Sequence, residues 1–226
     1  MGTLHLVRHG QASFGEADYD RLSELGSRQC HALGQYFAER GIAFEAVLRG
    51  TLRRHAQSLS ALDEGYASAA GALPHALEWP GLNEYDSEAV IRTVYSGPLA
   101  KPDSPEVYRH HFRLLREGLT KWMSGAAQPE GMPSWAAFVA GVAGALDHVK
   151  ARHEGHVLLV SSGGPIATAV SQVLNAPAET MIELNLRIRN SALTQFSYTP
   201  KRVSLDSFNH VPHLDRPERA GWITYT

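Results

Sequence analysis

Apolar residues along this chain follow two patterns: short runs typical of β-strands, and longer stretches with the spacing of an amphipathic helix. The short runs predict strands at residues 3–7, 46–48, 75–79, 156–161, 192–198 and 203–208. The run at 156–161 contains Val-Leu-Leu-Val and is the strongest signal for a strand buried on both faces. The last two runs flank Thr-Pro-Lys-Arg, which predicts a closing pair of strands joined by a turn.

Between these runs, apolar side chains recur three and four positions apart, which predicts helices. The helices are expected at residues 23–41, 51–66, 106–123, 134–152, 163–174 and 177–185. Ser23, Ser104 and Ser134 are predicted N-caps, because a serine oxygen accepts a hydrogen bond from the backbone at a helix start. Pro105 suits a first helical turn, and Gly41 suits a helix end.

Alternating strands and helices predict an α/β fold with three layers, α/β/α, and a mostly parallel central sheet. Residues 87–132 differ from the rest, because they contain Gly-Pro, Lys-Pro and Ser-Pro before the helix at 106–123. We interpret residues 1–226 as a single domain with a helical cap insertion at about 87–132, lying over the core.

Residues suited to phosphate chemistry follow three of the predicted strands. They are Arg-His-Gly at 8–10, Leu-Arg-Arg at 52–54 and Ser-Ser-Gly-Gly at 161–164. The carboxyl ends of parallel strands meet at one edge of a sheet, so we expect these segments to lie together. Guanidinium groups bind phosphate oxygens bidentately, a helix N-terminus favours an anion, and histidine can act as a nucleophile. The arrangement predicts phosphoryl transfer through a phosphohistidine.

Composition narrows the class of protein and its surroundings. The chain has 226 residues and a net charge of −2, which argues against a general nucleic-acid binder. Cys30 is the one cysteine, so an internal disulfide is excluded and a reducing compartment is favoured. The N-terminus lacks a signal peptide's apolar stretch, and the longest near-apolar run, 135–146, is too short for a membrane span. We expect a soluble cytoplasmic protein with no membrane or nucleic-acid partner; a homo-oligomer is left open.

Residues 6–11, Leu-Val-Arg-His-Gly-Gln, resemble the signature of the histidine phosphatase superfamily, which includes cofactor-dependent phosphoglycerate mutases. Residues 50–58, Gly-Thr-Leu-Arg-Arg-His-Ala-Gln-Ser, resemble the family's stretch Ser-x-Leu-x-Arg-Ala-x-Gln-Thr, with its arginine on Arg54 and not Arg53. Residues 82–84, Leu-Asn-Glu, resemble the segment that supplies an acid, and residues 190–191 and 213–214 resemble weaker late motifs. The resemblance covers most of the chain except the insertion.

The resemblance implies a role for each matched residue. His9 would attack phosphorus, Arg8 and Arg54 would hold the phosphoryl oxygens, and Glu84 would protonate the leaving group and then activate water. Asp86 and Glu88 are the nearby substitutes for Glu84. Gly10, Gln11, Ser162 and Gly163 would bind a small phosphorylated substrate. No metal and no cofactor are implied.

Two positions depart from the family pattern. Its second histidine, in a sequence like Ser-His-Gly-Gly, falls on Ser162, and losing such a transition-state donor costs on the order of 10²–10³ in rate. Residues that a fold could bring to the site instead are His55, His110, His111 and His213, although we expect each at the surface, as we do Arg53. Mutases usually have an asparagine at the position of Gly15, so a phosphatase is favoured over a mutase.

Three functions follow, in order of preference. The first is a metal-independent phosphatase that hydrolyses a phosphomonoester through His9. The second, suggested by Ser162, is a catalytically weak or inactive relative that binds a phosphorylated ligand or a protein partner. The third is a phosphoglycerate-type mutase.

The cap carries two groups of side chains with alternative roles. Its basic residues either line a substrate pocket or form a solvated helix face, which we favour: Arg92, Lys101, Arg109, His110, His111, Arg113 and Arg116. Its aromatic residues either line the pocket or pack the cap down, which we favour: Tyr95, Tyr108, Phe112 and Trp122.

Overall fold

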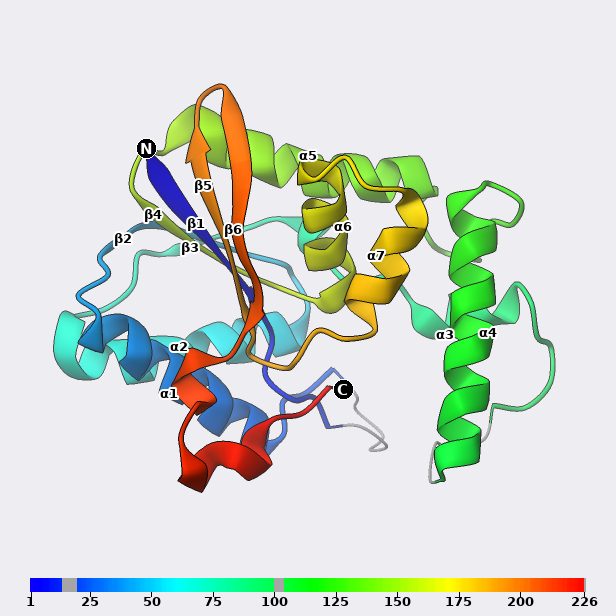
Figure 1. The fold of residues 1–226 in the computed structure, drawn as a ribbon, viewed down its shortest axis with the longest axis horizontal. Helices are drawn as coiled ribbons and strands as arrows, with labels where there is room; N and C mark the ends of the chain where they lie inside the picture. Colours follow the sequence, from blue (N-terminus) through cyan, green and yellow to red (C-terminus); the bar gives the residue numbers. More distant parts are fainter. Residues whose placement is uncertain (14–19, 100–103, 226) are drawn as a thin grey trace.

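A six-stranded sheet forms the centre of the computed structural model, which describes residues 1–13, 20–99 and 104–225 (Figure 1). Its strands are β1 (Gly2–Arg8), β2 (Phe44–Arg49), β3 (Ala76–Glu78), β4 (His156–Ser161), β5 (Leu193–Thr199) and β6 (Arg202–His210). They lie in the order β3-β2-β4-β1-β5-β6, with β1 to β4 parallel and β5 antiparallel to both neighbours. The predicted mostly parallel sheet is confirmed.

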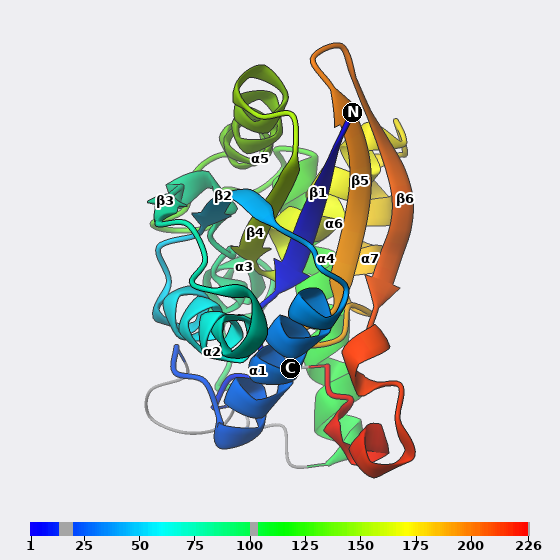
Figure 2. The ribbon, with the colours of Figure 1, turned by 90° about the vertical axis from the view of Figure 1, so that its left-hand side faces the viewer.

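Helices cover both faces of this sheet, as the predicted three-layer fold requires. On one face lie α1 (Glu24–Glu39) and α2 (Arg53–Ala70), and on the other lie α5 (Trp135–Arg152), α6 (Gly163–Val173) and α7 (Ala178–Asn185) (Figure 2). Successive strand residues point to opposite faces, so Leu6 packs on the α5–α6 side and Val7 on the α1–α2 side. Each face has its own buried apolar cluster.

The predicted serine caps are confirmed at three helix starts. The side chain of Ser23 accepts a hydrogen bond from the Gly26 amide in α1, and Ser134 accepts one from the Ala137 amide in α5. Ser104 accepts from the Val107 amide at the start of α4 (Pro105–Met123). Each cap satisfies one backbone donor that the first turn of a helix leaves without an intrahelical partner.

Residues 87–132, which we predicted to form a cap insertion, contain α4 and a second helix, α3 (Ser87–Arg92), which the sequence pattern did not predict. Asp86 caps α3 by accepting hydrogen bonds from the amides of Glu88 and Ala89. Helix α4 stands at one end of the molecule, beside α7, rather than over the core (Figure 1). One face of α4, including Leu119 and Trp122, joins the apolar cluster that α5 and α6 share.

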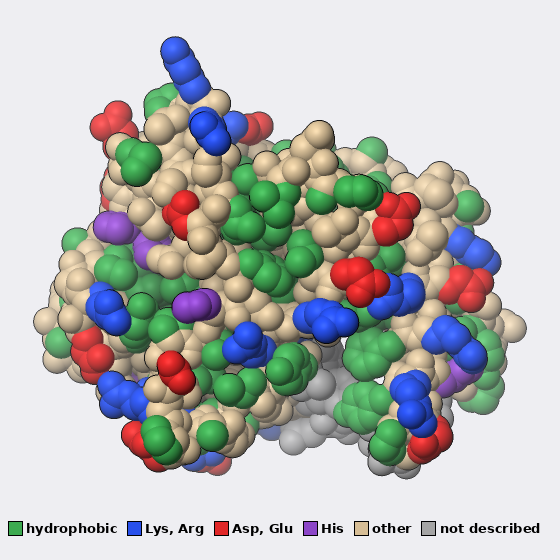
Figure 3. All heavy atoms as spheres, viewed as in Figure 1, with side chains coloured by type: hydrophobic (Ala, Val, Ile, Leu, Met, Phe, Trp, Pro, Cys, Tyr) green, Lys and Arg blue, Asp and Glu red, His purple; other side chains and the backbone are tan. Residues whose placement is uncertain are grey.

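Side chains of α4 outside this face meet solvent, and Lys and Arg side chains lie at the surface at its end of the molecule (Figure 3). Ion pairs join Arg109 to Glu106 and Arg92 to Glu88 on the helix surfaces, and Arg116 pairs with Glu183 of α7. The solvated-face interpretation of the basic residues is therefore confirmed, except that His111 is half-buried and Lys101 lies outside the described residues. Trp122 packs as expected, whereas Phe112 is 41% exposed.

The structure also bears on the single cysteine and on the predicted lack of a membrane span. Cys30 is buried and carries no disulfide. Within the described ranges, no helix has the length and apolar character that crossing a bilayer requires.

Candidate active site

The predicted rim of functional residues forms where β1 and β4 end side by side. Arg8 pairs with Ser161 in the parallel register of these strands, so the residues that follow each strand leave the sheet together. The His9 amide donates to the Ser161 carbonyl at 2.9 Å, and the His9 carbonyl accepts from the Ser191 amide at 3.1 Å. His9 is therefore fixed through its backbone on both sides.

The His9 ring is buried, at 2% exposure, and its orientation is set by its neighbour. Its Nδ1 lies 2.7 Å from the Gly10 carbonyl, and a carbonyl can only accept, so Nδ1 carries the hydrogen. Burial lowers the pKa of His9 well below 6.5, helped by the charges of Arg54 and Arg8. A neutral ring protonated at Nδ1 presents the lone pair of Nε2, which is the form that a nucleophile needs.

Gly10 and Gln11 serve the packing of α1 against this loop. A Cβ on Gly10 would overlap the Gly26 backbone, so the helix approaches as closely as it does because residue 10 has no side chain. The Gln11 amide donates to Gln29 Oε1 at 2.9 Å, and its own Oε1 accepts from the Ser23 hydroxyl at 2.9 Å. A contact of either residue with substrate stays a prediction.

Arg54 lies at the start of α2 and is almost fully buried, whereas Arg53 is exposed, as expected. The Arg54 guanidinium forms an ion pair of 2.7 Å with Asp20, a residue that the sequence analysis did not select. Asp20 also accepts a hydrogen bond from the Arg53 amide at 2.8 Å and so caps α2. This capping carboxylate lies 33 residues before Arg53, so no local pattern indicates it.

Arg8 reaches the opposite side of the rim from the end of β1. Its Nη1 donates to the backbone carbonyls of Ile188 and Tyr225, the latter at 3.2 Å. The C-terminal segment therefore helps to fix this guanidinium, which is 9% exposed.

Glu84 lies against the first turn of α6. Its carboxylate oxygens both lie 3.1 Å from the Gly164 amide, which donates to them. Burial raises the pKa of Glu84, while the Gly164 amide and the charges of Arg54 and Arg8 oppose that shift. The carboxyl thus holds a proton to higher pH than usual, as a general acid must. Asp86 caps α3 and Glu88 pairs with Arg92, so these two carboxylates are committed elsewhere.

Ser162 and His55 form a pair that the sequence analysis did not foresee. Ser162 Oγ lies 2.7 Å from His55 Nε2, and both side chains are fully buried. The centroid of the His55 ring lies 5.9 Å from that of His9. The surface prediction for His55 is wrong, because the residue after Arg54 points from the start of α2 toward the end of β4. Gly163 follows at the start of α6, where a Cβ would overlap the Asn185 side chain.

The other three candidate histidines lie in the core (His213) or on α4 (His110 and His111). The surface prediction for His213 is also wrong: it is 2% exposed and its Nε2 lies 2.8 Å from the Ser191 hydroxyl. His110 is exposed, as expected, and His111 is half-buried on α4. Among the described residues, His55 is the one of these four histidines whose ring lies against that of His9.

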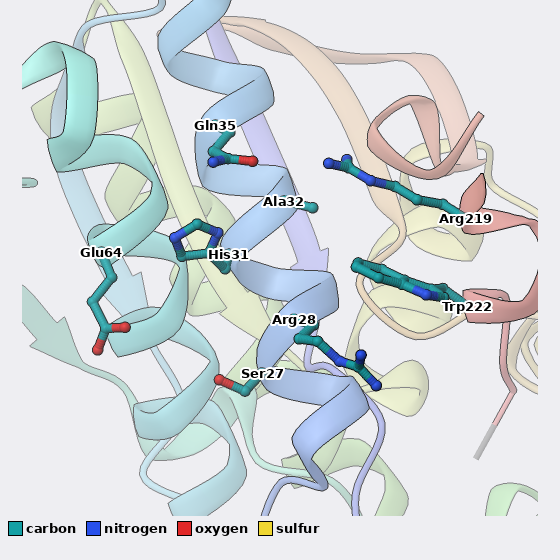
Figure 4. Close-up of a pocket in the computed structure, with 8 residues that line it drawn as sticks. All are labelled: Ser27, Arg28, His31, Ala32, Gln35, Glu64, Arg219 and Trp222. Atoms are coloured by element: carbon teal, nitrogen blue, oxygen red, sulfur yellow. The ribbon is translucent and has the colours of Figure 1, made fainter. Parts of the chain in front are cut away.

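Cavities elsewhere on the molecule do not involve the rim. One of about 220 Å³ lies between α1 and the C-terminal segment, with Arg28, Arg219 and Trp222 in its wall (Figure 4). A second, of about 570 Å³, lies near the end of β6. Neither is lined by a predicted site residue. Over the described part of the chain, no group of three or more His, Cys, Asp or Glu side chains is placed to hold a metal ion.

The family model of the histidine phosphatase superfamily (branch 1) matches residues 4–211. The chain therefore belongs to this superfamily. No sequence among the curated proteins matches it.

Solved structures share the fold at low sequence identity. Mycobacterial glucosyl-3-phosphoglycerate phosphatase has a TM-score of 0.65 and 22% identity, over 92% of this chain and 99% of its own. A phosphoserine phosphatase mutant from Entamoeba histolytica, bound to phosphoserine, has a TM-score of 0.62 and 19% identity, over 95% and 100%. Phosphoglycerate mutase from Bacillus anthracis has a TM-score of 0.63 and 18% identity, over 94% of each chain.

Proposed function

We propose that this protein is a metal-independent phosphatase that hydrolyses a small phosphomonoester through a phosphohistidine on His9. The observation that carries the proposal is the bond between His9 Nδ1 and the Gly10 carbonyl, at 2.7 Å. It fixes the ring in the tautomer whose Nε2 can attack phosphorus. The phosphatases among the structural neighbours support this reaction class, and the mutase neighbour supports phosphoryl transfer more broadly.

The first step transfers the phosphoryl group to the protein. The lone pair of His9 Nε2 forms a bond to phosphorus while the bond from phosphorus to the ester oxygen breaks. Burial raises the pKa of Glu84, which favours its acid form. In that form Glu84 gives its proton to the leaving oxygen, and an alcohol departs. Arg8 and Arg54 offset the charge that develops on the phosphoryl oxygens.

The second step returns the enzyme to its starting state. Glu84, now a carboxylate, accepts a proton from a water molecule whose oxygen attacks phosphorus. The bond between phosphorus and Nε2 breaks, its electron pair returns to the ring, and inorganic phosphate leaves. Each atom and proton is accounted for without a metal ion or a cofactor.

Two alternatives give different products or none. A mutase would return the phosphoryl group to an organic acceptor and would need a bisphosphate activator. The residue that argued against a mutase, Gly15, lies outside the described residues, so that argument still rests on sequence. A binding protein would retain phosphorylated ligands unchanged.

An aryl phosphate assay without added metal tests the proposal, with wild type, His9→Ala and His5→Ala. His5 is a buried histidine on β1 away from the rim, so its variant controls for the loss of a core imidazole. We expect wild type and His5→Ala to release inorganic phosphate and His9→Ala to lose at least 10³-fold in kcat. Acid-labile phosphate on His9 of quenched wild type would support the intermediate. Hydrolysis that persists in His9→Ala, or that needs a metal ion, would contradict the proposal.

A further inference from the structure

The hydrogen bond between Ser162 and His55 joins two elements that meet only in the folded protein. Ser162 follows β4 and His55 lies in the first turn of α2, 107 residues apart in sequence. Their Oγ and Nε2 atoms lie 2.7 Å apart, and neither side chain has measurable exposure. We expect this buried hydrogen bond to persist, because a buried donor or acceptor without a partner lowers the stability of the fold.

The position of Ser162 normally favours a different contact. Ser162 is the N-cap residue of α6, and a serine there usually accepts a hydrogen bond from the backbone of the first turn. Here the hydroxyl makes no such bond. The hydrogen bond that the hydroxyl makes in the described structure is to the imidazole of His55, so it does not cap the helix.

Room for the His55 ring comes from a glycine on the neighbouring strand end. A Cβ on Gly50 would overlap His55 Nδ1 and would lie 2.7 Å from Asn83 Oδ1. In the family pattern that residues 50–58 resemble, the first position is usually serine and the sixth alanine. The glycine and the histidine therefore depart from the pattern together, and each departure suits the other.

We propose that His55, acting through Ser162, supplies the second imidazole of this active site in place of the histidine expected at position 162. The imidazole comes from the start of α2 instead of the end of β4. The serine hydroxyl lies between this imidazole and the phosphoryl group and contacts both. Ser162 is then the catalytic residue and His55 its positioning residue. The inference rests on the proposed phosphatase function.

The pair acts by hydrogen bonding rather than by charge. Burial lowers the pKa of His55 to about 3, with Arg54 and Arg49 adding to the shift, so the ring is neutral at pH 7. When the ring hydrogen is on Nε2, His55 donates to Ser162 Oγ. The serine hydroxyl then directs its own hydrogen to a phosphoryl oxygen, since a hydroxyl donates and accepts at once. Positive charge at the site comes from Arg8 and Arg54.

A double-mutant cycle tests whether His55 acts through Ser162. We expect Ser162→Ala to lower kcat by about 10²-fold, which is the scale for one lost transition-state donor, and to change KM little. His55→Ala should lower kcat by roughly tenfold, and the double variant should be no worse than Ser162→Ala alone. His55→Gln keeps an N–H near the position of Nε2 and should recover most of the loss. Losses that multiply in the double variant, or an unchanged kcat in His55→Ala, would overturn the proposal.

Two controls separate this role from general damage. His5→Ala also removes a buried imidazole and should lower the melting temperature without lowering kcat. The site of phosphorylation in quenched wild type identifies the nucleophile, because phosphohistidine is acid-labile and phosphoserine is acid-stable. Acid-stable phosphate on Ser162 would overturn the proposal, since the serine would then be the attacking group.

Orthovanadate binding tests the pair separately from hydrolysis. Five-coordinate vanadate mimics phosphoryl transfer, so it binds the groups that serve the transition state. If wild type neither hydrolyses aryl phosphates nor forms phosphohistidine, the phosphatase proposal fails, but this measurement still decides the role of the pair. Vanadate affinity that falls most in Ser162→Ala, falls less in His55→Ala, falls no further in the double variant than in Ser162→Ala, and stays unchanged in His5→Ala supports the pair. Unchanged affinity in the first two variants would overturn it.

Discussion

The carboxylate of Asp20 lies 2.7 Å from the guanidinium of Arg54, the arginine that we propose binds the phosphoryl group. The same carboxylate caps α2 through the Arg53 amide at 2.8 Å. Asp20 therefore has two functions: it holds the arginine in place and it stabilises the helix that carries it. Under the proposed function, a phosphoryl group bound by Arg54 would share or displace the first of these contacts.

Replacing Asp20 by Asn separates the two functions. The amide oxygen still accepts from the helix start, while the negative charge beside Arg54 is lost. Because the Asp20 side chain is 36% exposed, its ion pair is worth at most about 1 kcal/mol, and we expect KM for an aryl phosphate to fall up to about fivefold. Steady-state kinetics at low and high salt measure this effect, which salt should diminish. A raised KM would mean that Asp20 orients Arg54 for substrate rather than competing with it.

Glu84→Gln should affect substrates according to their leaving groups. Glutamine cannot give a proton to the departing oxygen, so a phosphate ester of an aliphatic alcohol should lose about 10²–10⁴-fold in kcat. An ester of p-nitrophenol, whose anion leaves without a proton, should lose much less in the first step. Measuring both substrates on one preparation checks the role. Equal losses would assign Glu84 a different role, such as holding the Gly164 amide.

The pH dependence should have its maximum where His9 is neutral and Glu84 is protonated. At their ordinary values of 6.5 and 4.5, these two forms would hardly coexist. Burial lowers the pKa of His9 and raises that of Glu84, so the shifts widen the shared range. Activity should rise through a pKa below 6.5 and fall through one above 4.5. A kcat/KM profile measures both limbs, and Glu84→Gln should remove the alkaline one. A limb that persists in that variant would belong to another group.

Gly50→Ala should disturb His55 specifically. The new Cβ would overlap His55 Nδ1, and we expect a loss of about 1–3 kcal/mol in the free energy of unfolding and a lower kcat. Combining it with His55→Ala removes the overlap with the ring and leaves only the close approach to Asn83 Oδ1, so the double variant should be more stable than Gly50→Ala alone. Urea denaturation of the three variants measures this coupling. Additive losses of stability would show that the methyl group strikes something other than the ring.

Acid should destabilise the protein through its buried histidines. Burial lowers the pKa of His5, His55 and His213 to about 3 in each case. A depressed pKa contributes stability that is present above the unfolded value near 6.5 and is lost as pH falls. Between pH 7 and 5, each histidine should cost up to about 2 kcal/mol. Denaturation midpoints across that range measure the loss, and His5→Phe should make it shallower. An unchanged slope would mean that His5 is already charged in the fold.

Local rules predicted the helix starts and strand positions well. Ser23, Ser104 and Ser134 each cap a helix through an amide three residues later, so the residues that make the contact stand together in the sequence. The β4 strand was the clearest prediction for the same reason, because burial on both faces leaves a continuous apolar run. Helix α3 was missed because six residues give too little periodicity to detect.

Site residues that belong to a sequence motif were predicted. Site contacts between residues that lie far apart in the sequence were not. Arg8 and His9 were found because they are adjacent at a strand end. The environment of His55 depends on Ser162, 107 residues away, and the partner of Arg54 lies 34 residues earlier. Neither separation along the sequence is one that helical or strand periodicity brings together, so no local pattern indicates these contacts. The composition around His55, with a charged Arg54 before it, indicates an exposed helix start instead.

The strand order has a consequence for how the chain is made. Strand β4 lies between β1 and β2, yet more than a hundred residues separate it from the end of β2. While the ribosome is still synthesising residues 87–132, the strand edges of β1 and β2 that will pair with β4 have no partner, and the apolar face that α5 and α6 will cover is exposed. The same late segment brings Ser162 to His55. The proposed active site is therefore completed by the segment that also covers those edges, and a chain that stops before residue 156 should lack that site and be prone to self-association.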